Sequence, residues 1–342
     1  MITKFKSSVI ILILLTGILQ AQSGSSITKT GMTAAPFLTI DVGSRSKAMG
    51  GAFVAVANDL SSFYWNPAGL ANIDKTGITF SHMKWIAEIN FDFAGVNIPV
   101  GNLGNIGAWI TTVSMPEMEV RTVYEQEGTG EFFSASDLAL GLSYSRNITE
   151  RFSIGMNFKY IQEKIYKMTA NTTAIDFGTL FRTGFNDMVI GMSISNFGGY
   201  MQMLGIDTQV DYDITPGEGG NNDRILANLR TENFQLPLTF RVGLAMDIFK
   251  SELNYVTIAA DAVVPNDNAQ YVNIGTEYNL WNLISLRAGY KSLLMPNSEE
   301  GLTLGAGINQ SIFGGVKLTV DYVYGDFGLL NNIQELSLNI YF

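Results

Sequence analysis

Apolar and polar residues alternate along most of the chain after residue 76. From Leu238 to Ile248 every even position is apolar, while the odd positions are small or polar. The same period of two recurs at 152–160, 284–290, 316–322 and 336–340. Successive side chains of a β-strand point to opposite faces, so each segment predicts a strand with one apolar face and one wet face.

The alternating segments have the length of strands that cross a membrane at a tilt. We expect strands at 77–85, 88–98, 105–114, 136–146, 152–163, 172–182, 187–197, 237–249, 255–264, 271–279, 284–291, 301–309, 315–324 and 333–342. Soluble β-sandwiches alternate as well. Here the wet face is rich in Gly, Ser, Asn and isolated charges, as a narrow polar lumen requires. The prediction is an all-β transmembrane barrel of about 14 antiparallel strands.

The connections between these strands alternate in length. Six are short: 99–104, 147–151, 183–186, 250–254, 280–283 and 310–314. The connections between them are mostly longer: 115–135, 164–171, 198–236, 265–270, 292–300 and 325–332. Membrane barrels have tight periplasmic turns and longer external loops. An even number of strands then places both termini on the periplasmic side, and the last strand ends on an aromatic residue, Phe342.

One expected strand breaks the alternation. Phe91 and Phe93 occupy odd positions, whereas Val96 and Ile98 occupy even positions. A change of phase within a strand indicates an extra residue, so we expect a β-bulge in 88–98.

The N-terminus has the features of an export signal. Lys4 and Lys6 precede an apolar run at 9–19, and Ala21 offers a cleavage site. The run is too short to span a bilayer as a helix, and a buried core helix is the less favoured alternative. We therefore expect a signal peptide at 1–21, an N-terminal hatch at 22–76 and a barrel at 77–342.

Residues 22–76 do not alternate. Ser44 can cap a helix over about 45–58 that contains many small residues. The adjacent Gly50 and Gly51 weaken such a helix, but they allow it to approach another backbone closely inside a lumen. Asn66-Pro67 followed by Gly69 is a turn signal beside three aromatic residues.

This segment resembles the N-terminal signature of the PorV/PorQ family, which is related to the FadL-type transporters. The resemblance rests on Gly43, Arg45, Ala48, Gly50, Gly51, Ala52, Asp59, Trp65, Asn66, Pro67, Ala68 and Gly69. It implies a fourteen-stranded outer-membrane barrel with a hatch and a role in type IX secretion. The implied partners are the outer-membrane lipid, the translocon or secreted client proteins. A FadL-like carrier of hydrophobic small molecules is the alternative.

Composition narrows the chemistry. The net charge is −10 and no basic cluster occurs, which argues against nucleic-acid binding. The chain has no Cys and a single His, His82, so the usual catalytic nucleophiles, bases and metal ligands are scarce. No G-x-S-x-G motif is present. We expect a non-enzymatic protein without a cofactor.

Charged residues at wet-face positions are candidates for the lumen. They are Lys159, Arg241, Asp247, Glu277, Arg287, Lys317 and Asp321, with Asn157 beside them. Their mixed signs predict ion pairs that brace the hatch, and Arg45 is the expected hatch partner for one of the acids. The acidic loop 198–236 is interpreted as a solvated external loop and possible partner-facing lid; a calcium site there is the alternative.

Overall fold

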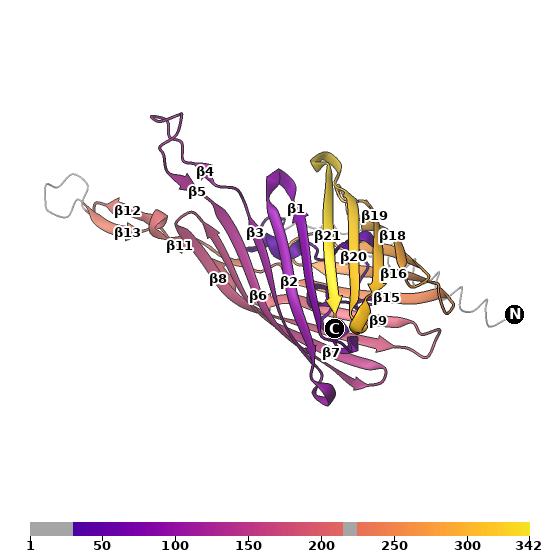
Figure 1. The fold of residues 1–342 in the computed structure, drawn as a ribbon. Coiled ribbons are helices and arrows are strands. Elements are labelled where there is room, and N and C mark those ends of the chain that lie inside the picture. Colours follow the sequence, from indigo (N-terminus) through magenta and orange to yellow (C-terminus); the bar gives the residue numbers. More distant parts are fainter. Residues whose placement is uncertain (1–29, 215–223) are drawn as a thin grey trace.

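The computed structural model describes residues 30–214 and 224–342. Fourteen antiparallel strands form a closed barrel, and the yellow last strand lies beside the purple first strand (Figure 1). The strands are β1 (Gly77–Lys84), β2 (Asn90–Pro99), β3 (Asn105–Ser114), β6 (Ala135–Thr149), β7 (Phe152–Ile165), β8 (Met168–Arg182), β9 (Val189–Gly198), β15 (Thr239–Lys250), β16 (Tyr255–Pro265), β17 (Tyr271–Leu280), β18 (Ile284–Leu293), β19 (Leu302–Ser311), β20 (Lys317–Asp326) and β21 (Asn332–Tyr341). The predicted fold and strand number are confirmed.

The two faces of the wall differ as the alternation predicts. In β15, Phe240 and Leu244 point outward and are 39% and 47% exposed, whereas the intervening Arg241 is 6% exposed and faces the lumen. The outer face is therefore apolar all round, and burying it in lipid removes the exposed hydrocarbon from water. Among the described residues no helix is long and apolar enough to cross a membrane.

The lumen is filled by the segment that precedes β1. Its short helices are η1 (Pro36–Thr39), α2 (Ser44–Ala48), α3 (Ser62–Trp65) and η2 (Pro67–Asn72). We call residues 33–76 the hatch. At one end Thr33 bridges to Gln235 and hydrogen-bonds to Asp267, and at the other end the chain enters β1 opposite Tyr341. The hatch thus runs through the barrel from one edge to the other.

The two edges of the barrel carry different connections. One, which we call the short-turn edge, has the connections 100–104, 150–151, 183–188, 251–254, 281–283 and 312–316. The opposite long-loop edge carries 115–134 and 199–238, and the described parts of both connections project beyond the barrel (Figure 1). The C-terminus lies at the short-turn edge. The first described residues lie at the long-loop edge, where Thr33 bridges to Gln235, and the predicted signal peptide at 1–21 lies outside the described residues.

Small strands organise the long loops. The pairs are β4 (Met118–Glu119) with β5 (Phe132–Phe133), β10 (Tyr200–Gln202) with β14 (Asn233–Gln235), and β12 (Gln209–Tyr212) with β13 (Ile225–Asn228), while β11 (Leu204–Gly205) extends the sheet beside β8. The remaining short helices, η3 (Ile86–Glu88), η4 (Gly101–Leu103), η5 (Ile206–Thr208), η6 (Phe313–Gly315) and η7 (Gly328–Leu330), lie in connections.

The expected bulge in the second strand is wrong. β2 pairs with both β1 and β3 without a break in register. Phe91 and Phe93 face inward and are completely buried, and Phe93 packs on Phe63 of the hatch at 6.4 Å between ring centroids. The strand is apolar on both faces because its inner face meets the hatch core instead of water.

The expected helix over 45–58 is also wrong. Helix α2 ends at Ala48, and Gly50 and Gly51 adopt positive φ angles of 65° and 75°. Two successive left-handed residues end a right-handed helix. The expected cap is absent too, since the N-cap is Gly43 and the Ser44 hydroxyl instead contacts Ser337 of the wall.

The expected loop at 164–171 is a tight turn. β7 and β8 extend to Ile165 and from Met168, leaving Tyr166 and Lys167 between them. Tyr166 has a φ of 52°. Two-residue hairpins usually contain Asn-Gly or a similar pair, so a Tyr-Lys turn has no local signal.

Candidate functional site: the plugged lumen

Glycines on both partners bring the hatch into direct contact with the wall. A Cβ atom at Gly50 would lie 2.7 Å from the Tyr290 nitrogen. On the wall, a Cβ at Gly191 would lie 2.4 Å from the Val54 oxygen, and one at Gly289 would lie 2.2 Å from the Gly50 nitrogen. Both are closer than real Cβ contacts allow. Backbone therefore packs on backbone, which leaves no open channel along these contacts.

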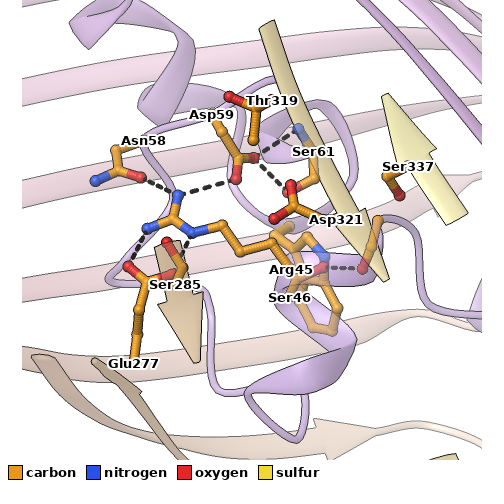
Figure 2. Close-up of polar contacts among 12 residues, drawn as sticks. Arg45, Ser46, Asn58, Asp59, Ser61, Glu277, Ser285, Thr319, Asp321 and Ser337 are labelled. Carbon is orange, nitrogen blue, oxygen red and sulfur yellow. Dashed lines mark hydrogen bonds and ion pairs between the residues drawn. The ribbon is translucent and has the colours of Figure 1, made fainter. Parts of the chain in front are cut away.

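Arg45 connects the hatch to the neighbouring barrel wall (Figure 2). Its Nε and Nη2 donate to the two carboxylate oxygens of Glu277 in β17, both at 2.8 Å. Its Nη1 donates to Asn58 at 2.6 Å and to Asp59 at 3.0 Å within the hatch. A bidentate guanidinium–carboxylate pair fixes both distance and orientation. One side chain thus joins two parts of the hatch to the barrel.

The ion pair between Arg45 and Glu277 is part of a larger network along the barrel wall. Arg287 of β18 donates to Glu277 at 2.6 Å and to Asp321 of β20 at 2.6 Å. Burial would lower the pKa of Arg45, but the carboxylates of Glu277 and Asp59 outweigh it and raise that pKa well above its ordinary value. The Arg45 guanidinium therefore stays charged. We call Arg45, Asp59, Glu277, Arg287 and Asp321 the Arg45 cluster.

The backbone of the hatch is also held by wall carboxylates. Asp261 of β16 accepts hydrogen bonds from the Phe53 and Val54 nitrogens at 2.7 and 2.8 Å. Lys47 pairs with Glu335 of β21 at 2.6 Å, and both side chains are buried. Together with Glu277, these anchors come from strands between β16 and β21, so one side of the barrel wall holds this part of the hatch.

Lys291 of β18 supplies a further anchor. Its Nζ lies 2.7 Å from Asp41 of the hatch and 2.6 Å from Glu300. This contact lies near the long-loop edge, whereas the Arg45 cluster lies nearer the short-turn edge.

The Trp-Asn-Pro element closes the hatch on itself and on the wall. Asn66 donates to the oxygens of Val54 and Thr179 at 2.9 and 3.0 Å and accepts a bond from the Ala68 nitrogen. Trp65 is fully buried, and its Nε1 donates to the Val42 oxygen at 2.9 Å. Pro67 and Gly69 stand in η2, where a Cβ at Gly69 would lie 2.3 Å from the oxygen of Ala57.

The remaining lumen candidates divide into two groups. Lys159 pairs with Asp176 at 2.7 Å, Asn157 donates to the Phe63 oxygen, and Arg241 lies over the rings of Tyr64 and Trp65. Asp247 and Lys317 lie near the short-turn edge. Asp247 contacts Lys250 at 3.6 Å, and no ion pair involves Lys317 within the described residues.

An apolar chamber occupies the part of the lumen enclosed by β1 to β8. Its wall includes Phe91, Phe93 and Trp109, and the hatch contributes Phe37 and Leu38 from η1. The space left between these side chains, which is lined on one side by Lys159, Asp176 and Arg241, is about 20 Å³, roughly the room needed by one water molecule. The chamber is therefore filled by the chain itself.

The single histidine and the acidic loop 198–236 were the two other candidates, for catalysis and for calcium binding. His82 points outward and contacts Asp92 at 2.7 Å, whereas Ser81 points inward and contacts Ser337. In the described part of the chain, no three acidic or His side chains gather as metal ligands. That statement leaves aside Glu218 and Asp223 of the acidic loop, which lie outside the described residues.

Several anchors were missed from the sequence. Asp261 is the only charged residue of β16, and this isolation in an alternating strand was a usable signal. Lys47 and Glu335 carried no comparable signal, because nothing local indicates that two residues 288 positions apart meet. The wall glycines were assigned to a polar lumen surface, whereas they make room for the hatch backbone.

A closed barrel of fourteen strands with its lumen filled by an N-terminal hatch defines a plugged transmembrane β-barrel. Two solved structures share the fold. The toluene transporter TodX of Pseudomonas putida has 13% identity and a TM-score of 0.53, with 86% of this chain and 95% of that chain covered. The toluene transporter TbuX of Ralstonia pickettii has 11% identity and a TM-score of 0.52, with 88% and 97% covered.

The sequence comparison is more specific. The family model described as type IX secretion system protein PorV matches residues 22–267. The chain therefore belongs to the PorV family, and the resemblance noted in the hatch motif is confirmed. No curated protein matches the chain.

Proposed function

We propose that this protein is a closed docking barrel of the type IX secretion system, which binds secreted clients or the translocon through its long-loop edge and catalyses no reaction. The observation that carries the proposal is the anchored hatch. A lumen blocked by backbone contacts and buried ion pairs does not let solutes diffuse through the barrel. The function is therefore assigned to the exposed surfaces of the barrel. Membership of the PorV family supplies the secretion context.

The long-loop edge has the features of a partner-binding surface. Connection 115–134 and the described parts of connection 199–238 extend beyond the wall and contain paired strands (Figure 1). Tyr124 and Val123 are 97% and 83% exposed near the end of the first hairpin. Long structured loops on a rigid scaffold are common binding elements. In this proposal the short turns, the start of β1 and the end of β21 all face the periplasm, and residues 1–21 are removed during export.

A pull-down tests the proposal directly. The tagged full-length protein is isolated in mild detergent from its own cells, alongside a variant in which 115–134 is replaced by a short Gly-Ser turn. We expect type IX translocon or cargo proteins on the native barrel and a loss of at least tenfold with the variant. A control is replacement of the short turn 251–254, which should retain partners. Equal recovery with both variants, or no type IX component with the native protein, would contradict the proposal.

A transporter of hydrophobic molecules is the second candidate, because an apolar chamber lies behind the hatch. Its residual space of about 20 Å³ is too small for an aromatic hydrocarbon, so Phe37 and Leu38 would have to leave. Soaking with a brominated hydrocarbon separates the candidates. Density in the chamber with η1 displaced favours transport, and an unchanged η1 favours docking.

A further inference from the structure

A cavity of about 180 Å³ lies at the long-loop edge, between the hatch and the consecutive wall strands from β18 to β1. We call it the rim pocket. The hatch contributes four residues to its lining, Thr39, Ile40, Asp41 and Lys47. Of the described residues, only Ile40 lines both this pocket and the filled apolar chamber. An engineered apolar cavity of about 150 Å³ binds benzene, so the rim pocket has room for one aromatic ring.

One end of the rim pocket is apolar and aromatic. Trp85 follows β1 and Phe327 follows β20, and their rings meet edge to face with centroids 5.2 Å apart. Val323 and Ile333 complete this end of the lining. The Lys47 ammonium lies 5.9 Å from the centroid of the Trp85 ring. A second aromatic ring can make the same two kinds of contact, with the edge of a ring and with the ammonium, whereas an aliphatic group cannot.

The other end of the rim pocket is polar. There Lys291 contacts Asp41 at 2.7 Å and Glu300 at 2.6 Å, which leaves the ammonium one hydrogen for a further acceptor. The side chains of Lys291 and Glu300 are 15% and 25% exposed, so both can reach a group in the pocket. A hydroxyl group can accept from Lys291 and donate to Glu300 at the same time. Because these two partners have opposite charges, a neutral hydroxyl suits this end better than an ammonium or a carboxylate.

We propose that the rim pocket binds a single phenol ring, with its hydroxyl beside Lys291 and Glu300. The strand order supports this orientation, because the polar end belongs to β18 and β19 and the apolar end to β20, β21 and β1. Free phenols and the tyrosine side chain of a bound protein supply the same chemistry. A plain hydrocarbon ring leaves the polar end without a partner, so the pocket should discriminate against it.

Titration calorimetry on the full-length barrel in detergent tests the assignment. The probe is 4-methylphenol, and the matched control ligands are toluene, which lacks the hydroxyl, and 4-methylcyclohexanol, which lacks the aromatic ring. We expect 4-methylphenol to bind with a Kd of about 1 mM or tighter and each control to bind about fivefold more weakly or worse. N-acetyltyrosinamide then identifies the source of the ring. An affinity equal to that of 4-methylphenol assigns the pocket to a tyrosine side chain, and a weaker affinity assigns it to free phenols.

Thr39→Trp should block the rim pocket, because Thr39 is an exposed hatch residue in its lining. We expect the affinity for 4-methylphenol to fall about tenfold or more. Leu329→Trp is the matched control, since Leu329 is 88% exposed and does not line the pocket. Both variants are measured in the same detergent, so partition of the ligand into micelles affects them equally.

Glu300→Ala tests the polar end separately. The substitution removes the acceptor of the hydroxyl, so the affinity for 4-methylphenol should fall to that for toluene, while toluene binds as to the native protein. No saturable binding of 4-methylphenol, equal affinity for either control ligand, or native affinity in Thr39→Trp would overturn the proposal. None of these measurements depends on the secretion role.

Discussion

Replacement of Arg45 by Ala should release the hatch without dismantling the barrel. The substitution removes four hydrogen bonds, two to Glu277 and one each to Asn58 and Asp59. Breaking a buried ion pair by removing one partner costs about 3–5 kcal/mol, because the other charge is left without compensation. Here Glu277 keeps Arg287 at 2.6 Å, which places the expected loss near the lower value, about 3 kcal/mol.

Amide hydrogen exchange measures this loss locally. A loss of about 3 kcal/mol in the free energy of hatch opening accelerates exchange on the order of 100-fold when exchange reports the opening equilibrium. The acceleration should appear in 43–65 and be absent from strands β6 and β7 on the far side. The hatch exchange rate of Arg45→Lys should lie between those of the native protein and of Arg45→Ala, because an ammonium group cannot form the bidentate pair.

Lys250→Ala provides the matched control. Its ion pair with Asp247 is long, at 3.6 Å, and the Lys250 side chain is 67% exposed. Such surface pairs contribute about 0–1 kcal/mol, so exchange of the hatch should change less than about fivefold. If Arg45→Ala leaves hatch exchange within threefold of the native protein, the Arg45 cluster does not hold the hatch and our reasoning fails.

Further predictions concern the plug, its anchors and the topology. Gly191→Val should displace the hatch at Val54, so that small solutes enter liposomes in a swelling assay. Gly184→Val is the control, because its Cβ would meet only Arg151 at 3.6 Å, and equal permeability of the two variants would contradict close packing. Asp261→Ala should raise amide exchange at Phe53 and Val54 about fivefold or more, since it removes the acceptor of both hydrogen bonds and each contributes about 1 kcal/mol, and unchanged exchange would remove Asp261 as an anchor. The chain lacks cysteine, so Val123→Cys should react with an impermeant thiol reagent on intact cells and Glu252→Cys should not; the reverse result would invert the proposed topology.

The sequence by itself determined the wall. Alternation has a period of two residues and is a local property, so it identified the strands and their lipid-facing side without any knowledge of their partners. The alternating connection lengths and even strand number then placed Gly77 and the end of β21 at the same edge. Two parts of the wall misled: β2, since Phe91 and Phe93 face a protein core inside the lumen, and the connection after β7, which is a turn of two residues where a loop was expected.

The hatch was predictable as a segment but not as a conformation. Small residues from Ala48 to Ala57 suggested a helix, and Gly50 and Gly51 suggested close packing. The close packing is present, while the helix stops at Ala48 because Thr303 and Asp261 of the wall form hydrogen bonds with the hatch backbone instead. Tertiary hydrogen bonds overrode the local preference.

The ion pairs were decided by tertiary structure alone. The sequence identified Arg45 and a set of candidate acids, and it predicted that one of them would pair with the hatch. Which acid that is depends on the register of every strand between them, and Arg45 and Glu277 lie 232 residues apart. Pairing of neighbouring strands places Glu277, Arg287 and Asp321 on inward positions of β17, β18 and β20, where the long Arg287 side chain connects the two acids and completes the anchor of the hatch.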